Sequence, residues 1–375
     1  MFQAPKSYCP DITLMSKPSN SRKLILTCSL GALLSTAALT QQYSRGVLQE
    51  KYSPYTAVLM AEALKCVISL AYIVHSKRGL QPIIMQSKPM SLPALVYFVQ
   101  NALGYWIFNT GISASEVSVL MQSKLLTTAV FRTIFLRQPL SYQKWRSLGI
   151  ITVAGVMIAQ GVGEATQGDK VQALDTATSS TTATATDSGP RNAWLGVIGC
   201  LVSALTSASA GVLLEYQYKS NLTEEKKTDI VAPRLDVENN LNEENKKAET
   251  TKKSEMYHDR LLQVAIKNFQ LGIFSFAFGT VALCTFDLTH TLEYGIFHGV
   301  SKFMFFAALV MALAGLYVGL IIHELDAIFK NLATTIEIML NTMISVMLFG
   351  KVLQPDFVYG TPIIMLSVLS YSLSD

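Results

Sequence analysis

The feature that most constrains this chain is a recurring apolar segment of about 20 residues, a length that crosses the hydrocarbon core of a bilayer as an α-helix. These segments cover approximately residues 24–40, 54–75, 92–110, 115–136, 145–162, 194–217, 262–284, 303–323, 326–349 and 357–373. The third and fourth segments are joined by a very short turn, and so are the eighth and ninth. The chain is therefore predicted to be an all-α polytopic membrane protein with about ten transmembrane helices.

Composition agrees with a membrane environment. Hydrophobic residues make up 50% of the 375 residues and charged residues only 15%, whereas soluble proteins carry about 25% charged residues. Side chains that face a lipid bilayer need not be polar, which accounts for the deficit. The net charge of +4 and the lack of any basic helix predict no nucleic-acid partner. The five cysteines form no CxxC or CxxH pair, so no cofactor, metal or disulfide framework is expected.

The apolar segments and the polar stretches between them divide the chain into parts. These are a cytosolic N-terminal segment (1–23), a first five-helix repeat (24–162), a Ser/Thr-rich lumenal loop (163–192), a sixth helix (193–217), a charged cytosolic linker loop (218–261) and four remaining helices (262–375). Lysine and arginine cluster at alternate connections, so the positive-inside rule places both termini in the cytosol. Both long loops lack apolar periodicity and are predicted to be flexible.

A repeat is suggested by comparing the two halves of the chain. The fourth segment contains Lys124-Leu-Leu-Thr-Thr-Ala129, and the ninth segment contains Lys330-Asn-Leu-Ala-Thr-Thr335. An odd number of spans in each half means that the second half is inserted upside down relative to the first. Two inverted five-helix repeats are typical of alternating-access transporters, whose solute site lies between the halves near the middle of the membrane.

Three lysines lie deep inside the apolar segments. Lys65, Lys124 and Lys267 are flanked on both sides by largely apolar or small residues, and a charge at the centre of a membrane helix costs about 2.5–3.5 kcal/mol on insertion scales. These lysines are predicted to line a polar cavity that attracts an anion such as a phosphate. Glu62 precedes Lys65 by one helical turn, so it either neutralises this lysine or forms a gate with it. Lys330 lies near the start of its segment, where it either snorkels to the interface or takes part in gating.

Amide side chains accompany the buried lysines and are candidates for binding a sugar or a base. They are Gln100, Asn101, Gln122, Asn268 and Gln270. The sequence contains no P-loop and no G-x-G-x-x-G, H-E-x-x-H or G-x-S-x-G motif, so no catalytic residue or metal site is predicted. Without a nucleotide-hydrolysing domain, transport would be secondary and driven by solute gradients or by exchange.

Several motifs around these residues occur in a consistent order. They include Ala57-Val-Leu-Met-Ala-Glu-Ala-Leu-Lys65, Leu95-Val-Tyr-Phe-Val-Gln-Asn101, Gln122-Ser-Lys-Leu-Leu-Thr-Thr-Ala129, Lys267-Asn-Phe-Gln270, Gly315-Leu-Tyr317 and Asp326-Ala-Ile-Phe-Lys330. In these motifs the chain resembles the nucleotide-sugar transporters of the UDP-galactose, UDP-N-acetylglucosamine and CMP-sialic acid group, within the drug/metabolite transporter superfamily. The resemblance runs from about Tyr52 to the end of the chain and excludes both long loops.

The resemblance implies a multi-pass antiporter of the Golgi membrane, or alternatively of the endoplasmic reticulum. Such a protein imports a nucleotide sugar and returns the nucleoside monophosphate. By the same resemblance Lys65 and Lys124 approach the phosphates or the sugar, and the amides of the third and seventh segments bind nucleotide or sugar. Tyr317 and His323 also fall in the implied substrate site, although His323 stands where the family usually has a lysine.

The resemblance leaves the substrate open. Gly272 and Leu126 are similar to the UDP-sugar carriers, so exchange of UDP-galactose or UDP-N-acetylglucosamine for UMP is the leading prediction. The alternative is a CMP-sialic acid/CMP antiporter or another phosphorylated-metabolite carrier. Val117 and Met121 stand where the family usually has tyrosines. A transport-inactive scaffold protein of the same fold is therefore a further alternative. A membrane enzyme acting on lipid-linked sugars is a further alternative, and a homodimer is left open.

Overall fold

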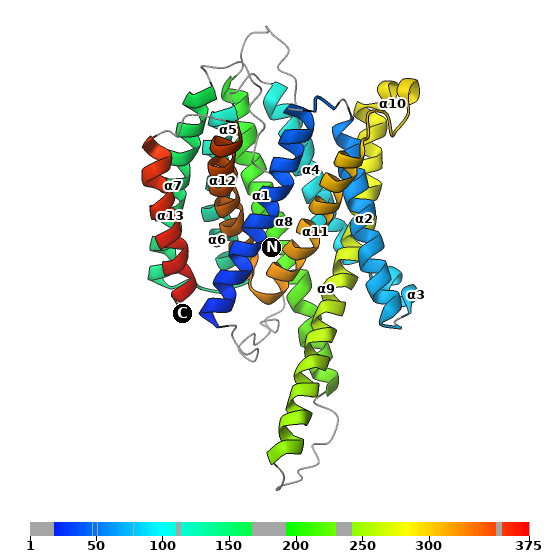
Figure 1. Ribbon diagram of the computed structural model, residues 1–375. Coiled ribbons are helices and arrows are strands. Elements are labelled where there is room, and N and C mark those ends of the chain that lie inside the picture. The colour runs from blue at the N-terminus through cyan, green and yellow to red at the C-terminus, as the bar shows by residue number, and fades with distance from the viewer. Residues whose placement is uncertain are drawn as a thin grey trace, which may run out of the picture.

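The structure, a computed structural model, describes residues 19–46, 48–50, 52–77, 79–109, 114–166, 193–229, 242–349 and 355–374. Within these ranges all regular secondary structure is helical. The helices pack side by side in a bundle (Figure 1). This confirms the predicted all-α fold class.

Each predicted apolar segment coincides with one helix, except the fourth, which forms a pair of helices. The helices are α1 (Asn20–Gly46), α2 (Pro54–His75), α4 (Ser91–Asn109), the pair α5 (Ala114–Met121) and α6 (Ser123–Phe135), α7 (Tyr142–Thr166), α8 (Ala193–Asp229), α9 (Asn242–Phe286), α11 (Lys302–Glu324), α12 (Ala327–Phe349) and α13 (Pro355–Leu373). Shorter helices α3 (Leu80–Met85), η2 (Lys88–Met90) and α10 (Leu288–Tyr294) lie in the connections.

The fourth segment differs from the prediction of one continuous helix because the chain makes a turn at Gln122. The Gln122 N–H group donates to the carbonyl of Val119, and the Leu125 N–H group donates to the carbonyl of Gln122. Both bonds span three residues, which is the 3₁₀ pattern and interrupts the regular α-helical ladder. Such a break does not alter the apolar composition of the segment, so hydropathy alone does not reveal it.

Five of the described helices are long and apolar enough to cross a membrane. Their apolar stretches are Asn20–Gln41, Tyr55–His75, Trp194–Lys219, Tyr257–Phe286 and Lys302–Glu324. Many large hydrophobic side chains on the outside of the bundle are exposed, including Val67, Val153 and Leu366. This surface suits contact with lipid rather than with water. A total of ten spanning helices stays a prediction.

Local sequence explains where several helices begin. Pro54 occupies the first turn of α2, where its missing N–H group is not needed. Ser301 precedes α11, and its hydroxyl accepts two backbone N–H groups of the first turn. Asp326 precedes α12, and one of its carboxylate oxygens accepts two N–H groups in the same way. The short connection between α11 and α12 is therefore closed by a capped helix start.

The contacts between helices have a regular pattern. In the first half α1 packs against α11 and α12, and in the second half α8 packs against α4 and the pair α5–α6. Helix α2 packs against α9, and α7 packs against α13. Exchanging each helix of the first half with its counterpart in the second, α1 with α8 and α4 with α11 for example, reproduces these contacts.

The two ends of the bundle differ. Helix α1 begins and α13 ends at one end, and α8 and α9 extend beyond the bundle at that same end (Figure 1). The short helix α10 lies at the other end.

The linker predicted as a flexible loop over 218–261 is helical at both of its ends, because α8 continues to Asp229 and α9 begins at Asn242. Its sequence places acids four residues before lysines, as in Glu243 and Lys247, a spacing that stabilises helices without tertiary packing.

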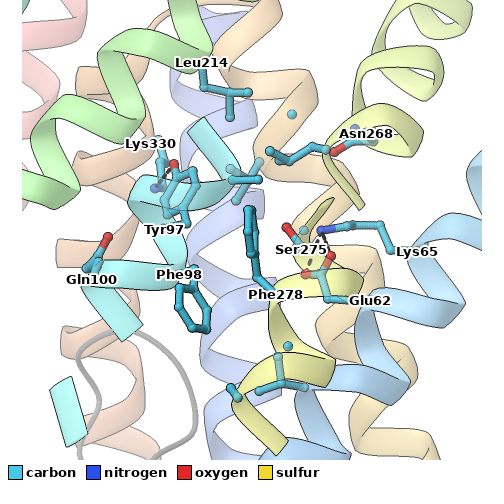
Figure 2. Close-up of a pocket in the computed structure, with 18 of the residues that line it drawn as sticks. Glu62, Lys65, Tyr97, Phe98, Gln100, Leu214, Asn268, Ser275, Phe278 and Lys330 are labelled. Atoms are coloured by element: carbon cyan, nitrogen blue, oxygen red, sulfur yellow. Dashed lines mark hydrogen bonds and ion pairs between the residues drawn. The ribbon is translucent and has the colours of Figure 1, made fainter. Parts of the chain in front are cut away.

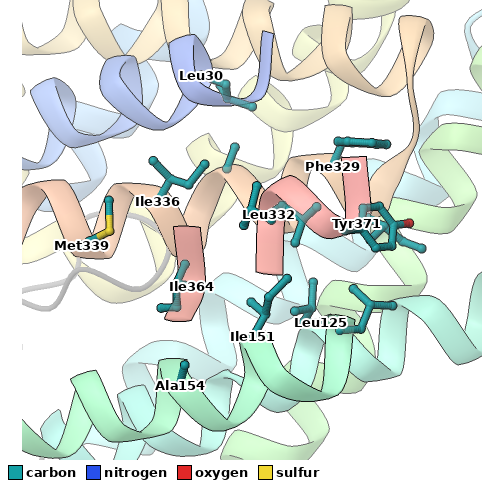
Figure 3. Packing of buried hydrophobic residues seen from close by; sticks show 14 of the residues in the cluster. Leu30, Leu125, Ile151, Ala154, Phe329, Leu332, Ile336, Met339, Ile364 and Tyr371 are labelled. Atoms are coloured by element: carbon teal, nitrogen blue, oxygen red, sulfur yellow. The ribbon is translucent and has the colours of Figure 1, made fainter. Parts of the chain in front are cut away.

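The largest hydrophobic cluster joins α1, α6, α7, α11, α12 and α13 (Figure 3). Leu30, Ile151 and Leu332 in this cluster are fully buried, and the ring of Tyr371 packs edge-on against Phe329. Close packing of this kind resists displacement of one helix relative to another. The cluster therefore fixes the position of α12, which carries one wall of the cavity described next.

Candidate functional site

A cavity with a volume of about 350 Å³ lies within the bundle. Its walls come from α1, α2 and α4 in the first half of the chain and from α8, α9, α11 and α12 in the second half. A mostly apolar lining with a few polar groups and a volume in this range are typical of a small-molecule site. The polar and charged side chains that line it are Tyr55, Glu62, Lys65, Tyr97, Gln100, Asn268, Ser275, Lys330, Thr334 and Glu337. All of these except Tyr55, Thr334 and Glu337 are labelled in Figure 2.

Lys65 forms an ion pair with Glu62 on the cavity wall. Its Nζ lies 2.7 Å from Glu62 Oε1 and 2.6 Å from Glu62 Oε2. Both residues belong to α2, and Lys65 is only 6% exposed. Gly315 on α11 leaves room for the lysine stem, because a Cβ atom there would lie 3.3 Å from Lys65 Cδ. The pair therefore holds a balanced positive and negative charge at the surface of the cavity.

Lys330 approaches the cavity from the opposite wall (Figure 2). Its Nζ donates a hydrogen bond to Tyr97 Oη at 3.1 Å and lies 5.0 Å from the centre of the Tyr97 ring. A cation at this distance is attracted by the aromatic ring. Lys330 therefore points into the cavity and does not snorkel, although it lies in the first turn of α12.

One end of the cavity is lined by Asn268 on α9 and Gly319 on α11. The Asn268 amide donates to the carbonyl of Val264 at 3.1 Å. A Cβ atom at Gly319 would lie 2.6 Å from Tyr218 Oη and closer still to the Asn268 amide. The buried Tyr218 hydroxyl has no hydrogen-bond partner within the described ranges. The missing side chain at Gly319 thus allows two polar side chains to approach the backbone of α11.

The cavity extends from this point toward the end of the bundle that carries α10. Its lining on α9 runs from Asn268 to Phe286, a rise of about 27 Å for a regular helix. At the far end the ring of Phe286 stacks on Tyr55 of α2, with ring centres 6.2 Å apart and planes inclined by 12°. These two aromatic residues lie where α2 begins and α9 ends.

A network of buried ion pairs lies at the opposite end. Arg132 on α6 lies 3.2 Å from Glu215 on α8 and 3.3 Å from Asp326 before α12. Glu215, which is fully buried, also pairs with Lys219 and accepts the N–H group of Ala327. Arg132 and Asp326 lie near helix ends, yet they pair with charged residues of the bundle instead of reaching into the interface. The network connects α6 with α8 and α12, two helices that contribute to the cavity wall.

A second group of ion pairs lies at the same end. Glu324, the last residue of α11, lies 3.1 Å from Arg22 on α1 and 3.6 Å from Arg260 on α9. Together the two groups connect α1, α6, α8, α9, α11 and α12. Charge pairs therefore link these helices at the end where α1 begins, while the lining of the cavity extends toward α10.

The structure brings five of the sequence-predicted site residues to the cavity wall. They are Glu62, Lys65, Gln100, Asn268 and Lys330. The Oε1 atom of Gln100 is buried and has no hydrogen-bond partner in the part of the chain that is described. It is therefore available to a ligand that carries an N–H or O–H group.

Four predicted residues pack elsewhere. Gln122 lies against Gly155 on α7, and the Gln270 amide donates to the backbone carbonyl of Ile83 at 2.8 Å. Tyr317 packs against the hydrophobic cluster of Figure 3. The buried ring of His323 packs edge-on against the ring of Tyr218, with centres 5.9 Å apart.

The remaining predicted residues have three different placements. Lys124 is buried behind the cavity wall, close enough to Lys330 and Glu337 to interact with them electrostatically. Lys267 is buried on α9 outside the cavity lining. Asn101 lies on α4, and its side chain falls outside the described part of the structure. Among the described residues no group of three His, Cys, Asp or Glu side chains is arranged to hold a metal ion.

The cavity also contains residues that the sequence analysis did not assign to the site. Tyr97 and Phe98 were quoted only as part of a motif, and Thr334 and Glu337 were not assigned. Helical spacing contains a signal for the last two, because residues four and seven positions after Lys330 lie on the same face of α12. Once Lys330 is known to face the cavity, helical spacing predicts that Thr334 and Glu337 face it as well.

A family profile and several similar proteins indicate the same family for this chain. The sequence profile of the nucleotide-sugar transporters matches residues 19–224 and 255–372. The UDP-galactose translocator of Mus musculus is 27% identical over 347 residues, which cover 89% of this chain and 74% of that protein. CMP-sialic acid transporter 2 of Oryza sativa subsp. indica is 28% identical, with coverage of 96% and 86%. The UDP-N-acetylglucosamine transporter of Rattus norvegicus is 27% identical, with coverage of 84% and 85%.

A solved crystal structure is similar with a TM-score of 0.60 and 11% sequence identity, and the match covers 95% of this chain and 98% of the other. At that identity the similarity concerns the fold alone. The family and the names of the relatives indicate a transporter rather than an enzyme. Because the profile match spans most of the sequence, the chain belongs to the nucleotide-sugar transporter family.

Proposed function

We propose that this protein imports a UDP-sugar, either UDP-galactose or UDP-N-acetylglucosamine, into the Golgi lumen in exchange for UMP. The observation that carries the proposal is the cavity that Lys65 and Lys330 approach from opposite walls. Lysine ammonium groups bind phosphates, and two of them suit the charge of a nucleotide. Relatives named for UDP-galactose and UDP-N-acetylglucosamine support the same substrate class.

The proposed mechanism is alternating access between two inverted five-helix repeats. The symmetrical contacts of α1 with α11 and α12, and of α8 with α4 and α5–α6, support the repeat. In this mechanism the cavity, whose lining extends toward α10, would be closed at the other end by the ion pairs of Arg132, Glu215 and Asp326. Opening at the closed end would require these pairs to separate. Closure at the other end would bring α2 and α9 together around Tyr55 and Phe286.

The proposed orientation places the closed end in the cytosol. The start of α1, the end of α13 and the long charged extensions of α8 and α9 all lie at that end (Figure 1). The positive-inside rule assigns the basic connections to the cytosol, so both termini would be cytosolic. In this orientation the structure represents a state in which the cavity faces the Golgi lumen.

Exchange of CMP-sialic acid for CMP is the second candidate. One observation favours it: the rice relative named for CMP-sialic acid aligns with 96% of this chain, more than the 89% aligned with the mouse UDP-galactose translocator. The cavity lysines would accept either nucleotide, because phosphate groups are common to both.

Reconstitution of the full chain in liposomes tests the proposed function. Liposomes would be preloaded with UMP, with CMP or with buffer alone, and then offered radiolabelled UDP-galactose, UDP-N-acetylglucosamine or CMP-sialic acid. We expect uptake of a UDP-sugar that depends on internal UMP. Exchange confined to the cytidine nucleotides would favour the second candidate, and no exchange of any nucleotide sugar would contradict both.

Gly319→Ala is expected to weaken binding of UMP without unfolding the protein. The added methyl group would displace the Asn268 amide and the Tyr218 hydroxyl, which are ends of side chains and not backbone. Loss of one hydrogen bond to the ligand corresponds to a roughly 2- to 10-fold weaker affinity. Isothermal titration of the purified protein with UMP would measure it. Gly149→Ala is the matched control, since a Cβ atom there meets nothing within 4 Å; equal affinity in both variants would remove this end of the cavity from the nucleotide site.

A further inference from the structure

Glu337 is a cavity carboxylate with no assigned role. It lies on α12 and lines the same wall as Lys330 and Thr334. Within the described ranges its carboxylate forms no hydrogen bond or ion pair at contact distance, whereas Glu62, the other carboxylate in the lining, is held by Lys65. Glu337 therefore keeps its hydrogen-bond acceptors open to the cavity.

The surroundings of Glu337 supply counter-charge without occupying it. Lys124 on α6 is its cationic neighbour and interacts with it electrostatically from behind the wall. Lys330 is instead hydrogen-bonded to Tyr97. Counter-charge nearby lowers the cost of a buried carboxylate, while the lack of a direct partner leaves its oxygens free to accept hydrogen bonds from a ligand.

We propose that Glu337 is a specificity-determining residue that selects a nucleotide sugar with a neutral sugar and rejects one whose sugar carries a carboxylate. This inference rests on the proposed function, because it concerns the substrate of the same cavity. In its charged form, which the nearby cation of Lys124 favours, the Glu337 carboxylate only accepts hydrogen bonds. The hydroxyl or amide donors of a neutral sugar would satisfy it. A second carboxylate brought against it provides no donor and adds like-charge repulsion.

A simpler role for Glu337 would be to neutralise Lys124 and so stabilise the fold. The two roles differ in what they predict for matched ligands. Loss of a purely neutralising charge would change the affinity for all nucleotide ligands by a similar factor. Loss of a selecting charge would change the affinity for an acidic sugar relative to its neutral counterpart.

UDP-galactose and UDP-galacturonate form a suitable pair of probes because they differ only at C6. This carbon is a hydroxymethyl group in UDP-galactose and a carboxylate in UDP-galacturonate. Their dissociation constants and that of UMP would be measured by isothermal titration of the full-length protein in detergent. Glu337→Gln removes the charge and keeps the shape of the side chain. Glu293→Gln on α10 makes the same chemical change at an exposed position outside the cavity and serves as the control.

We expect the unaltered protein and Glu293→Gln to bind UDP-galactose at least about tenfold more tightly than UDP-galacturonate, and Glu337→Gln to lose most of that ratio. A tenfold ratio corresponds to about 1.4 kcal/mol of repulsion removed. An unaltered protein that binds both sugars equally would overturn the inference, and so would an unchanged ratio in Glu337→Gln. This experiment measures binding, whereas the liposome experiment measures exchange. Failure of UMP exchange in liposomes would therefore contradict the proposed antiport without deciding whether Glu337 selects the sugar.

Discussion

Lys65→Met is expected to lower the exchange of UDP-galactose for UMP by roughly 10- to 100-fold, the effect of losing a hydrogen bond to a charged group. The ammonium of Lys65 is the only charge on its wall of the cavity, within the described lining, that attracts a phosphate. Methionine has a similar length and no charge. Without Lys65 the carboxylate of Glu62 would be left at the cavity wall, where it would repel an anionic ligand. Initial uptake rates into UMP-loaded liposomes would measure the loss.

A double variant separates the two consequences of this substitution. Lys65→Met alone removes both the binding charge and the partner of Glu62, so it is expected to lower thermal stability as well. Glu62→Gln combined with Lys65→Met removes both charges and should recover thermal stability while exchange stays low. If the double variant exchanged nucleotides at the rate of the unaltered protein, Lys65 would serve only to neutralise Glu62.

Glu215→Gln is expected to destabilise the protein by roughly 3–5 kcal/mol, the cost of removing one partner of a buried ion pair. Glu215 is fully buried and lies between Arg132 and Lys219. Its second oxygen accepts the N–H group of Ala327 at the start of α12. The amide keeps the volume and one acceptor but leaves two largely buried cations, Arg132 and Lys219, with less counter-charge. The midpoint of thermal unfolding in detergent, followed by tryptophan fluorescence, would report the change.

Two further variants test whether the loss of stability in Glu215→Gln comes from the buried network of ion pairs. Glu293→Gln changes an exposed carboxylate on α10 and is expected to leave the unfolding midpoint nearly unchanged. Asp326→Asn, which removes the other partner of Arg132, should resemble Glu215→Gln because the same network is broken. An unfolding midpoint for Glu215→Gln equal to that of the unaltered protein would show that the network does not stabilise the fold.

Much of the fold could be predicted because membrane helices follow from local composition. An apolar run long enough to cross a bilayer forms a helix, since no other open structure satisfies its backbone groups in lipid. Two features lay beyond that rule. The turn at Gln122 divides the fourth segment into α5 and α6, and the charged linker continues α8 and α9 as helices. The first is a matter of backbone hydrogen bonding, and the second depends on charge spacing rather than on hydropathy.

The candidate site was predictable only in part. Lys65 and Glu62 could be paired from sequence because both lie on one face of one helix. The predicted emphasis on Lys124 and Lys267 differs from the structure, in which Lys330 reaches the cavity and those two lysines stand outside its lining. Flanking residues show how deeply a charge is buried, but they do not show which way its helix is rotated. These assignments of binding residues remain predictions that the variants above would test.

By itself the sequence determined the helical class, the approximate position of each apolar helix and the Glu62–Lys65 pair, because each of these depends on residues close together in the chain. Only the tertiary structure decided that Lys330 meets Tyr97 across the cavity and that Glu337 faces the same space. The physical reason is that the rotation of a helix about its axis is set by packing against helices distant in sequence. In this protein that packing selects which buried charges reach the cavity and which are paired behind its walls.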